Sequence, residues 1–324
     1  MNGLGRIIQK MNLKLLEDLK NNISRVMIGN ERTIKLIIAA ILAKGHVLLE
    51  DVPGTGKTVL AKSLARSVQA QFGRVQFTPD LLPSDVTGLN YFDSKKSEFQ
   101  FREGPVFCNI LLADEINRAT PKTQSSLLEC MAEGQVTVDG KTRVLETPFF
   151  VIATQNPLEN LGTFPLPEAQ TDRFLMRIGM ENMTQQQELS MVERFLTDEP
   201  LTALESICQK EELVKLQEQC CDIYIHKDLL RFMIETVHAT RNHPKIMQGI
   251  SPRGTLAFVR AAQGFAMTEG RDYVAPEDIK SVAIPVLSHR LTLAVPAEGA
   301  KYEEEILLEI LNSVPVPSED WDKR

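Results

Sequence analysis

A glycine-rich segment, Asp51–Thr58, limits what this sequence can fold into more than any other feature of the chain. It reads Asp-Val-Pro-Gly-Thr-Gly-Lys-Thr, and the apolar run His46–Glu50 precedes it. Leu60, Leu64 and Val68 follow at the spacing of one helical face. A buried strand that passes through a glycine loop into a helix is the setting that a phosphate-binding loop requires. The segment therefore predicts such a loop between a strand and a helix.

The residue types in this segment suit the binding of a nucleoside triphosphate. Gly54 and Gly56 let backbone N–H groups turn towards a β-phosphate, and the helix that begins near Thr58 adds the positive end of its dipole. Lys57 is expected to reach the β- and γ-phosphates, and the Thr58 hydroxyl to ligate Mg²⁺. The strict motif has glycine where this chain has Asp51. The alternative, a turn that only joins strand to helix, is disfavoured because the Gly-Lys-Thr end and its flanks are intact. The residues predicted to hold the nucleotide are Pro53, Gly54, Thr55, Gly56, Lys57, Thr58 and Val59.

The sequence around the loop predicts an α/β fold. From residue 34 to about residue 180, short apolar runs alternate with helix-length amphipathic stretches, as in a parallel sheet covered by helices. The runs are mostly continuous in apolar character, which is typical of strands buried on both faces. The candidate strands are His46–Glu50, Arg74–Phe77, Asn109–Ala113, Phe149–Thr154 and Phe174–Ile178. We expect residues 1–182 to form a five-stranded parallel sheet of the P-loop type.

Signals for helix starts dominate the rest of the chain. Thr184 and Gln187 have the spacing of a capping box. Ser251 supplies a capping hydroxyl immediately before a proline at the first helical position. The run Ala275–Asp278 places a proline and two acids at the positive end of a third helix. Residues 183–324 are therefore expected to form an all-α domain.

Two of these candidate strands, besides the one that precedes the loop, lead into polar residues at the same edge of the sheet. Ile110–Ala113 leads into Asp114 and Glu115, and a later apolar run leads into Asn156. One carboxylate beside a phosphate loop can hold the water shell of Mg²⁺, and its neighbour can accept a proton from an attacking water. We therefore assign Asp114 to the metal and Glu115 to the water. Asn156 either holds that water or senses the γ-phosphate; the alternative is a turn residue before proline.

Two arginines are candidates for stabilising the charge that spreads over the transferred phosphoryl group. A well-placed guanidinium accelerates this reaction by about 10³–10⁵. Arg173 precedes the fifth candidate strand, and Arg253 lies at the start of a helix in the second half. Many arginines are only solvated or paired with carboxylates, so neither assignment follows from the residue alone.

Taken together, these motifs resemble the MoxR family of AAA+ ATPases. The match extends from about Ile28 to Leu293. The segments that carry it, in order, are Asp51–Thr58, Leu111–Asn117, Ala153–Pro157, Leu166–Phe174 and Ser251–Gly254. The resemblance implies an AAA+ core over residues 1–182, a C-terminal all-α lid over residues 183–324, and hydrolysis of ATP with Mg²⁺.

The resemblance also implies roles for single residues and an assembly. By position, Lys57 and Thr58 are Walker A, Asp114 and Glu115 Walker B, Asn156 sensor 1, Arg173 the arginine finger that enters the neighbouring subunit, and Arg253 sensor 2 in the lid. Such proteins form ring homo-oligomers, here expected to be hexamers. The expected function is chaperone-like remodelling or maturation of protein complexes, with a von Willebrand A-domain protein or another client protein as partner.

Two hairpins are predicted within the α/β part. Gln135–Val144 alternates around Asp139-Gly140, which indicates a type I′ turn, and Tyr91–Phe101 reads as a second hairpin. They are placed like the pre-sensor 1 hairpin and the helix-2 insert of the family. The functional interpretation is that they move with the nucleotide state and touch a substrate at the centre of a ring; the alternative is decoration of the sheet edge.

Composition weighs against some functions and leaves others open. The net charge of −7 and the absence of a long basic run disfavour nucleic acid as a partner. A helicase-type nucleic-acid motor nevertheless stays an alternative because such motors share the pre-sensor hairpin. A metal-chelatase motor subunit is another, and it would need a chelating partner. The longest apolar run, Leu36–Ala43, is far shorter than the roughly 18 residues of a membrane span. No export signal is visible, so we expect a cytoplasmic protein.

Overall fold

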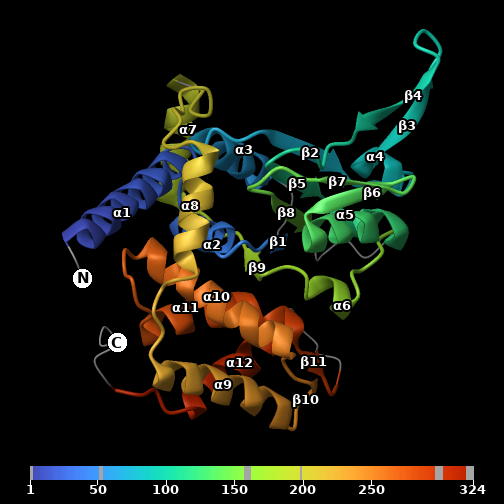
Figure 1. Ribbon diagram of the computed structural model, residues 1–324. Helices are drawn as coiled ribbons and strands as arrows, with labels where there is room; N and C mark the ends of the chain where they lie inside the picture. The colour runs from blue at the N-terminus through green and yellow to red at the C-terminus, as the bar shows by residue number, and fades with distance from the viewer. Residues whose placement is uncertain (1–2, 51–53, 157–161, 198, 296–301, 319–324) are drawn as a thin grey trace.

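The computed structural model describes residues 3–50, 54–156, 162–197, 199–295 and 302–318, with side chains from residue 12 onwards apart from that of residue 197. A central parallel sheet of five strands has the order β2-β5-β8-β1-β9 (Figure 1). Its strands are β1 Val47–Glu50, β2 Phe72–Gln76, β5 Ile110–Asp114, β8 Phe150–Gln155 and β9 Met176–Gly179. The five predicted strands are confirmed, with ends displaced by no more than two residues.

The continuous apolar character of the strands arises because both faces of the sheet are covered. Within β1, Val47 and Leu49 join one hydrophobic core, whereas Leu48 joins a second core on the opposite face. The first core contains residues of α1 Gly3–Ser24, α2 Glu31–Leu42 and α3 Lys57–Ser67. The second core contains residues of α4 Pro83–Thr87 and α5 Pro121–Glu133. The short helix η1 Ile116–Arg118 follows β5, and the short helix α6 Glu168–Thr171 precedes β9.

The second half of the chain is helical, as predicted. Its helices are α7 Gln185–Thr197, α8 Lys210–Cys220, α9 Lys227–Asn242, α10 Pro252–Thr268, α11 Pro276–Leu287, η2 Ser288–Arg290 and α12 Tyr302–Ser313. The three predicted starts are confirmed by their caps. Gln187 N–H donates to the Thr184 hydroxyl at 3.3 Å, Gly254 N–H to the Ser251 hydroxyl at 3.1 Å, and Ala275 N–H to the Asp278 carboxylate at 2.8 Å. An antiparallel ribbon of β10 Ile246–Gln248 and β11 Thr292–Leu293 was not predicted, because two or three residues are too few to show a period.

The helical half is joined to the α/β half through α2. Helix α10 approaches α2 so closely that a Cβ atom on Gly264 would lie 2.4 Å from the carbonyl oxygen of Ala39. An ion pair of 2.7 Å between Lys35 and Glu269 lies at the same joint. Residues of both halves belong to the first core, so the helical domain stands on the helix layer that covers the sheet.

Both predicted hairpins are present. The turn between β6 Gln135–Val138 and β7 Lys141–Val144 has φ of +50° at Asp139 and +74° at Gly140, as a type I′ turn requires. The other hairpin, β3 Gly88–Asp93 and β4 Glu98–Glu103, is longer than predicted and projects from the body as an arm (Figure 1). Among the described residues, no helix combines the length and the apolar character needed to cross a bilayer.

Candidate active site

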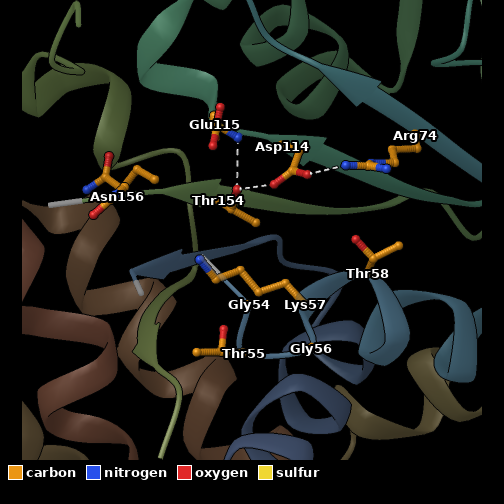
Figure 2. Close-up of a pocket in the computed structure, with 11 residues that line it drawn as sticks. Gly54, Thr55, Gly56, Lys57, Thr58, Arg74, Asp114, Glu115, Thr154 and Asn156 are labelled. Carbon is orange, nitrogen blue, oxygen red and sulfur yellow. Dashed lines mark hydrogen bonds and ion pairs between the residues drawn. The ribbon is translucent and has the colours of Figure 1, made fainter. Parts of the chain in front are cut away.

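A cleft of about 370 Å³ opens at the carboxyl end of the sheet, between the phosphate loop and the ends of β5 and β8 (Figure 2). It is lined by Gly54, Thr55, Gly56, Lys57, Thr58, Arg74, Asp114, Glu115, Thr154, Gln155 and Asn156. The fold thus brings the predicted loop together with the predicted carboxylates and amide. Val59, also predicted to hold nucleotide, packs against the first core instead of lining the cleft. Pro53 lies outside the described residues.

The loop has the backbone shape that its glycines allow. Gly54 has φ of +92° and Gly56 has φ of +89°, a region that residues with a side chain rarely adopt. Gly56 immediately precedes α3, so the N–H groups of the first turn of that helix face the cleft. Figure 2 shows the Lys57 side chain extending from the start of α3 towards the strand ends that carry the polar residues.

Asp114 is held at the end of β5 by two donors. Arg74 Nη2 lies 2.7 Å from its Oδ2, and the Thr154 hydroxyl donates to its Oδ1 at 2.8 Å. The same Thr154 oxygen accepts the backbone N–H of Glu115 at 2.8 Å. The Thr154 side chain is buried, so its hydroxyl fixes the relative position of both acidic residues from the adjacent strand. Arg74 and Thr154 were missed by sequence reasoning, although polar residues within apolar strand segments were a usable signal.

Glu115 occupies a strained position on the rim of the cleft. Its backbone is left-handed, with φ of +56° and ψ of +51°, which is uncommon for a residue other than glycine, asparagine or aspartate. Its carboxylate accepts hydrogen bonds from Gln76 Nε2 at 2.9 Å and from Arg118 Nη1 at 3.0 Å. Surrounding contacts therefore hold the carboxylate at a defined place beside Asp114. Asn156 follows β8 directly, is buried, and lines the cleft across from the loop.

The structure does not bring the two predicted arginines into this cleft. Arg173 and Arg253 line a second cleft of about 270 Å³, which shares no lining residue with the first among the described residues. Arg173 Nη1 donates to the carbonyl oxygen of Leu128 at 3.1 Å. Arg253 Nε lies 3.8 Å from Asp172 Oδ2, and its side chain is 55% exposed. Arg253, expected to act as sensor 2 in the lid, therefore lines the second cleft and not the cleft that holds the phosphate loop of its own chain.

A third arginine, Arg290, ties the helical domain to the segment that carries Arg173. Its buried side chain donates from Nε to Asp172 Oδ1 at 2.6 Å and from Nη2 to the Phe174 carbonyl at 2.6 Å. Burial lowers the pKa of Arg290, and the Asp172 carboxylate opposes that shift. The second cleft also includes Lys44 and Arg260, so it is predominantly cationic. No local motif marked Arg290, because its role depends on contacts between segments far apart in sequence.

The first cleft and the parallel sheet define the chain as a P-loop ATPase, and comparisons with known proteins narrow the class. A model described as "ATPase family associated with various cellular activities (AAA)" matches residues 46–176, and an AAA lid domain model matches residues 238–310. The uncharacterized protein YeaC of Bacillus subtilis is 48% identical over 94% of this chain and 95% of its own length. Chaperone MoxR1 of Mycobacterium tuberculosis is 39% identical over 91% of this chain and 80% of its own length.

A solved structure has the same fold over nearly its whole length. The crystal structure of a provisionally assigned ATPase from Cytophaga hutchinsonii has a TM-score of 0.89 and 37% identity, and covers 97% of this chain and 98% of that one. The chain belongs to the MoxR family of AAA ATPases. It is accordingly an enzyme that binds and hydrolyses ATP.

Proposed function

We propose that this chain is a ring-forming ATPase whose catalytic sites are completed between neighbouring copies, and that ATP turnover drives remodelling or maturation of client protein complexes. The observation that carries the proposal is the separation of the cleft that holds the phosphate loop, Asp114 and Glu115 from the cleft that holds Arg173 and Arg253. A transition state that needs both clefts is stabilised when the cationic cleft of one copy meets the phosphate-loop cleft of the next.

Within one copy, the residues of the first cleft divide the work of phosphate binding. The loop N–H groups and Lys57 bind the phosphates. The Thr58 hydroxyl and the Asp114 carboxylate both present oxygen to the cleft, and oxygen is the ligand type that Mg²⁺ prefers, so the residues fit that ion (Figure 2). When bound, Mg²⁺ would neutralise charge that develops on the phosphate oxygens.

Glu115 and Asn156 are the residues that would activate and orient the attacking water. Glu115 would accept the proton of the water as it attacks the γ-phosphorus, and Asn156 would orient it. Thr154 supports both acids from β8, so it acts as a positioning residue. Exchange of Glu115 for Gln should leave ATP bound while turnover falls to a small fraction, and undiminished turnover would remove Glu115 from this role.

Mixing inactive variants tests catalysis between copies. Glu115→Gln and Arg173→Ala proteins should each be inactive, yet regain activity when mixed under subunit exchange, because about one interface in four then combines an intact glutamate with an intact arginine. A mixture of Glu115→Gln and Arg253→Ala proteins should also regain activity if Arg253 acts on the nucleotide of the neighbouring copy. Silence of the first mixture, despite exchange verified by mass measurement, would contradict the proposal.

A third mixture provides a matched control. Arg173→Ala and Arg253→Ala proteins should stay inactive together, because no single copy then supplies both arginines to an interface. Recovery in this mixture would show that Arg253 acts on its own chain's nucleotide. The proposal that Arg173 and Arg253 of one copy serve the same neighbouring site would then be wrong.

The projecting β3–β4 arm supports contact with a protein client. Its Phe92 and Phe99 rings pack edge to face, with centres 5.4 Å apart, and are 53% and 76% exposed. At its root, Asn90 donates to Asp139 at 2.6 Å, and the Arg143 guanidinium lies 3.6 Å from the centre of the Phe101 ring. These contacts link the arm to the β6–β7 hairpin, so the two hairpins can move together.

Charges near the tip of the arm favour protein over nucleic acid. Asp93 and Glu98 balance Lys95 and Lys96, so the tip has no excess positive charge to attract phosphates. Pull-down with the Glu115→Gln protein loaded with ATP, with and without Phe99→Ser, should show a client that depends on the arm, and would reveal a von Willebrand A-domain partner. Stimulation of the ATPase by DNA, with no arm-dependent protein retained, would favour the nucleic-acid motor.

A further inference from the structure

Helix α7 exposes an apolar face that no other part of the described structure covers. Leu189, Val192 and Phe195 are about half exposed and Leu196 is 80% exposed. Leu189, Val192 and Leu196 stand at the spacing of one helical face. An amphipathic helix owes most of its stability in water to burial of that face. Contiguous exposed apolar residues of this kind mark a contact surface.

This helix is linked to the phosphate loop through the segment of residues 25–29. The Gln187 side chain lies against Gly29, where an added Cβ would stand 2.9 Å from Gln187 Cδ, and Arg194 donates to the carbonyl oxygen of Arg25. The same segment of chain reaches the phosphate loop, because an added Cβ on Gly56 would lie 3.3 Å from Met27 Cε. The N-terminus of α3, which follows Gly56, lines the cleft. A neighbour that brings arginines to this cleft therefore comes close to α7.

The cationic cleft has an exposed helix face of its own. Arg253, Leu256 and Arg260 lie at positions i, i+3 and i+7 of α10 and line the second cleft with Arg173. Leu256 lies between the two arginines along the helix, and it is 61% exposed. In Figure 1, α10 lies well apart from α7 of the same chain.

The two faces are complementary in the placement of their apolar residues and in charge. On α7, the apolar residues are accompanied by Glu188 and Glu193, both exposed. On α10, one exposed leucine stands between arginines. Apolar contact at the centre with opposite charges at the rim is the usual anatomy of a protein interface.

We propose that the α10 face of one copy docks on the α7 face of the next copy, with Leu256 packed against Leu189, Val192 and Leu196. Arg260 then faces the acids that accompany the α7 stripe, while Arg173 and Arg253 point into the neighbouring nucleotide cleft. The proposal rests on the function proposed above, and it adds the surface that positions those arginines. Because the two faces differ, the contact is head-to-tail and closes a ring or propagates.

The docked helix also connects assembly to nucleotide. Helix α7 is fixed to the segment at Met27 and Gly29 that touches the phosphate loop, so a shift of the loop on ATP binding moves the docking face. Assembly is therefore expected to be tighter with ATP than without nucleotide, and by linkage the assembled protein binds ATP more tightly.

Substitution of exposed leucines tests the surface. Leu196→Asp and Leu256→Asp should each abolish assembly, measured by sedimentation velocity with ATP in the Glu115→Gln background, and should lower ATPase activity at least about tenfold in the otherwise unmodified chain. Leu308→Asp on α12, which replaces a leucine that is 50% exposed elsewhere, is the matched control and should change neither. Thermal unfolding and binding of a fluorescent ATP analogue, both measured at dilutions at which neither protein assembles, should match the unmodified chain, which separates loss of docking from loss of fold.

Cross-linking tests the pairing directly. In a Cys221→Ser background, which removes the exposed native thiol, a Leu196→Cys chain mixed with a Leu256→Cys chain should form a cross-linked dimer on oxidation with ATP present. Either chain alone should form far less. Arg260→Glu should weaken assembly, and Glu188→Arg in the same chain should restore part of it.

The outcomes distinguish this surface from the function on which it rests. If the mixed cysteine chains do not cross-link while the Glu115→Gln and Arg173→Ala mixture recovers activity, the α7–α10 surface is wrong and catalysis between copies stands. If they cross-link while that mixture stays silent, the surface stands and the shared site is wrong. If Leu196→Asp leaves assembly and turnover intact and removes only a client from the pull-down, α7 is a client surface and the proposal is overturned.

Discussion

At the scale of single residues, the geometry of the first cleft depends on one buried hydroxyl. Thr154 donates to Asp114 and accepts from the backbone of Glu115, each at 2.8 Å, so β8 positions both acids that end β5. The left-handed backbone of Glu115 makes this support more important, because a strained residue keeps its conformation only while its surroundings enforce it.

Removal of that hydroxyl should slow turnover without abolishing ATP binding. Thr154→Val keeps the shape but leaves two partners unsatisfied, and the loss of hydrogen bonds to such groups should lower kcat about 10–100-fold with little change in the Kd for ATP. Thr154→Ser, which keeps the hydroxyl, should retain most activity. Steady-state kinetics give kcat and equilibrium binding gives the Kd for ATP of both variants. An equal loss of kcat in the serine variant would argue against this role for the hydroxyl.

At the scale of elements, the decisive contact is that of α10 with α2. Gly264 lets the two helices meet at a separation that excludes even a methyl group, since its Cβ would lie 2.4 Å from the Ala39 carbonyl oxygen. The joint sets where the helical domain stands on the sheet, and therefore where the cationic cleft lies relative to the phosphate loop.

A methyl group at this joint should push the helices apart. We expect Gly264→Ala to destabilise the chain by about 1–3 kcal/mol, because backbone cannot yield as a flexible side chain can. Gly179→Ala is the matched control, since its Cβ would meet only the Glu50 carbonyl oxygen at 3.8 Å and the change should be small. Denaturant unfolding gives both values, and equal stabilities for the two variants would show that the joint relaxes freely.

At the scale of the whole molecule, two buried histidines stand where distant segments meet. His46 Nδ1 accepts the N–H of Val151 at 3.1 Å, and its Nε2 lies 3.0 Å from the Met131 carbonyl oxygen, which joins β1, β8 and α5. His289 Nε2 lies 3.2 Å from the Phe174 carbonyl oxygen, between η2 and the start of β9. Burial lowers the pKa of His46 from 6.5 to about 4, and it also lowers that of His289.

The chain should therefore lose stability in mild acid. Below pH 6.5 the unfolded state binds a proton at His46 that the folded state refuses until about pH 4. The contribution is thus present in full above pH 6.5 and falls by about 1.4 kcal/mol per pH unit in between. His46→Gln should reduce the slope of unfolding free energy against pH over this range, whereas His238→Gln, at an exposed position, should not. An unchanged slope in the His46 variant would assign the acid sensitivity to other groups.

Local sequence determined the strands, the helix caps, the two hairpins and the phosphate loop. In each case the signal lies within a few neighbouring residues, as in the positive φ of Gly56 or the Asp139-Gly140 turn. The ends of β5 and β8 could also be predicted to meet, because the carboxyl ends of parallel strands share one edge of a sheet.

Only the tertiary structure decided which charged residues share a cleft. Arg74 and Thr154 reach Asp114 from strands that are its neighbours in space, and Arg290 reaches Asp172 across more than one hundred positions of sequence. The structure also places Arg173 and Arg253 together in a cleft apart from the phosphate loop of the same chain, which their separate motifs did not decide. Such placements follow from how the helical domain packs on α2, and packing is a sum of many weak long-range contacts that no short segment encodes.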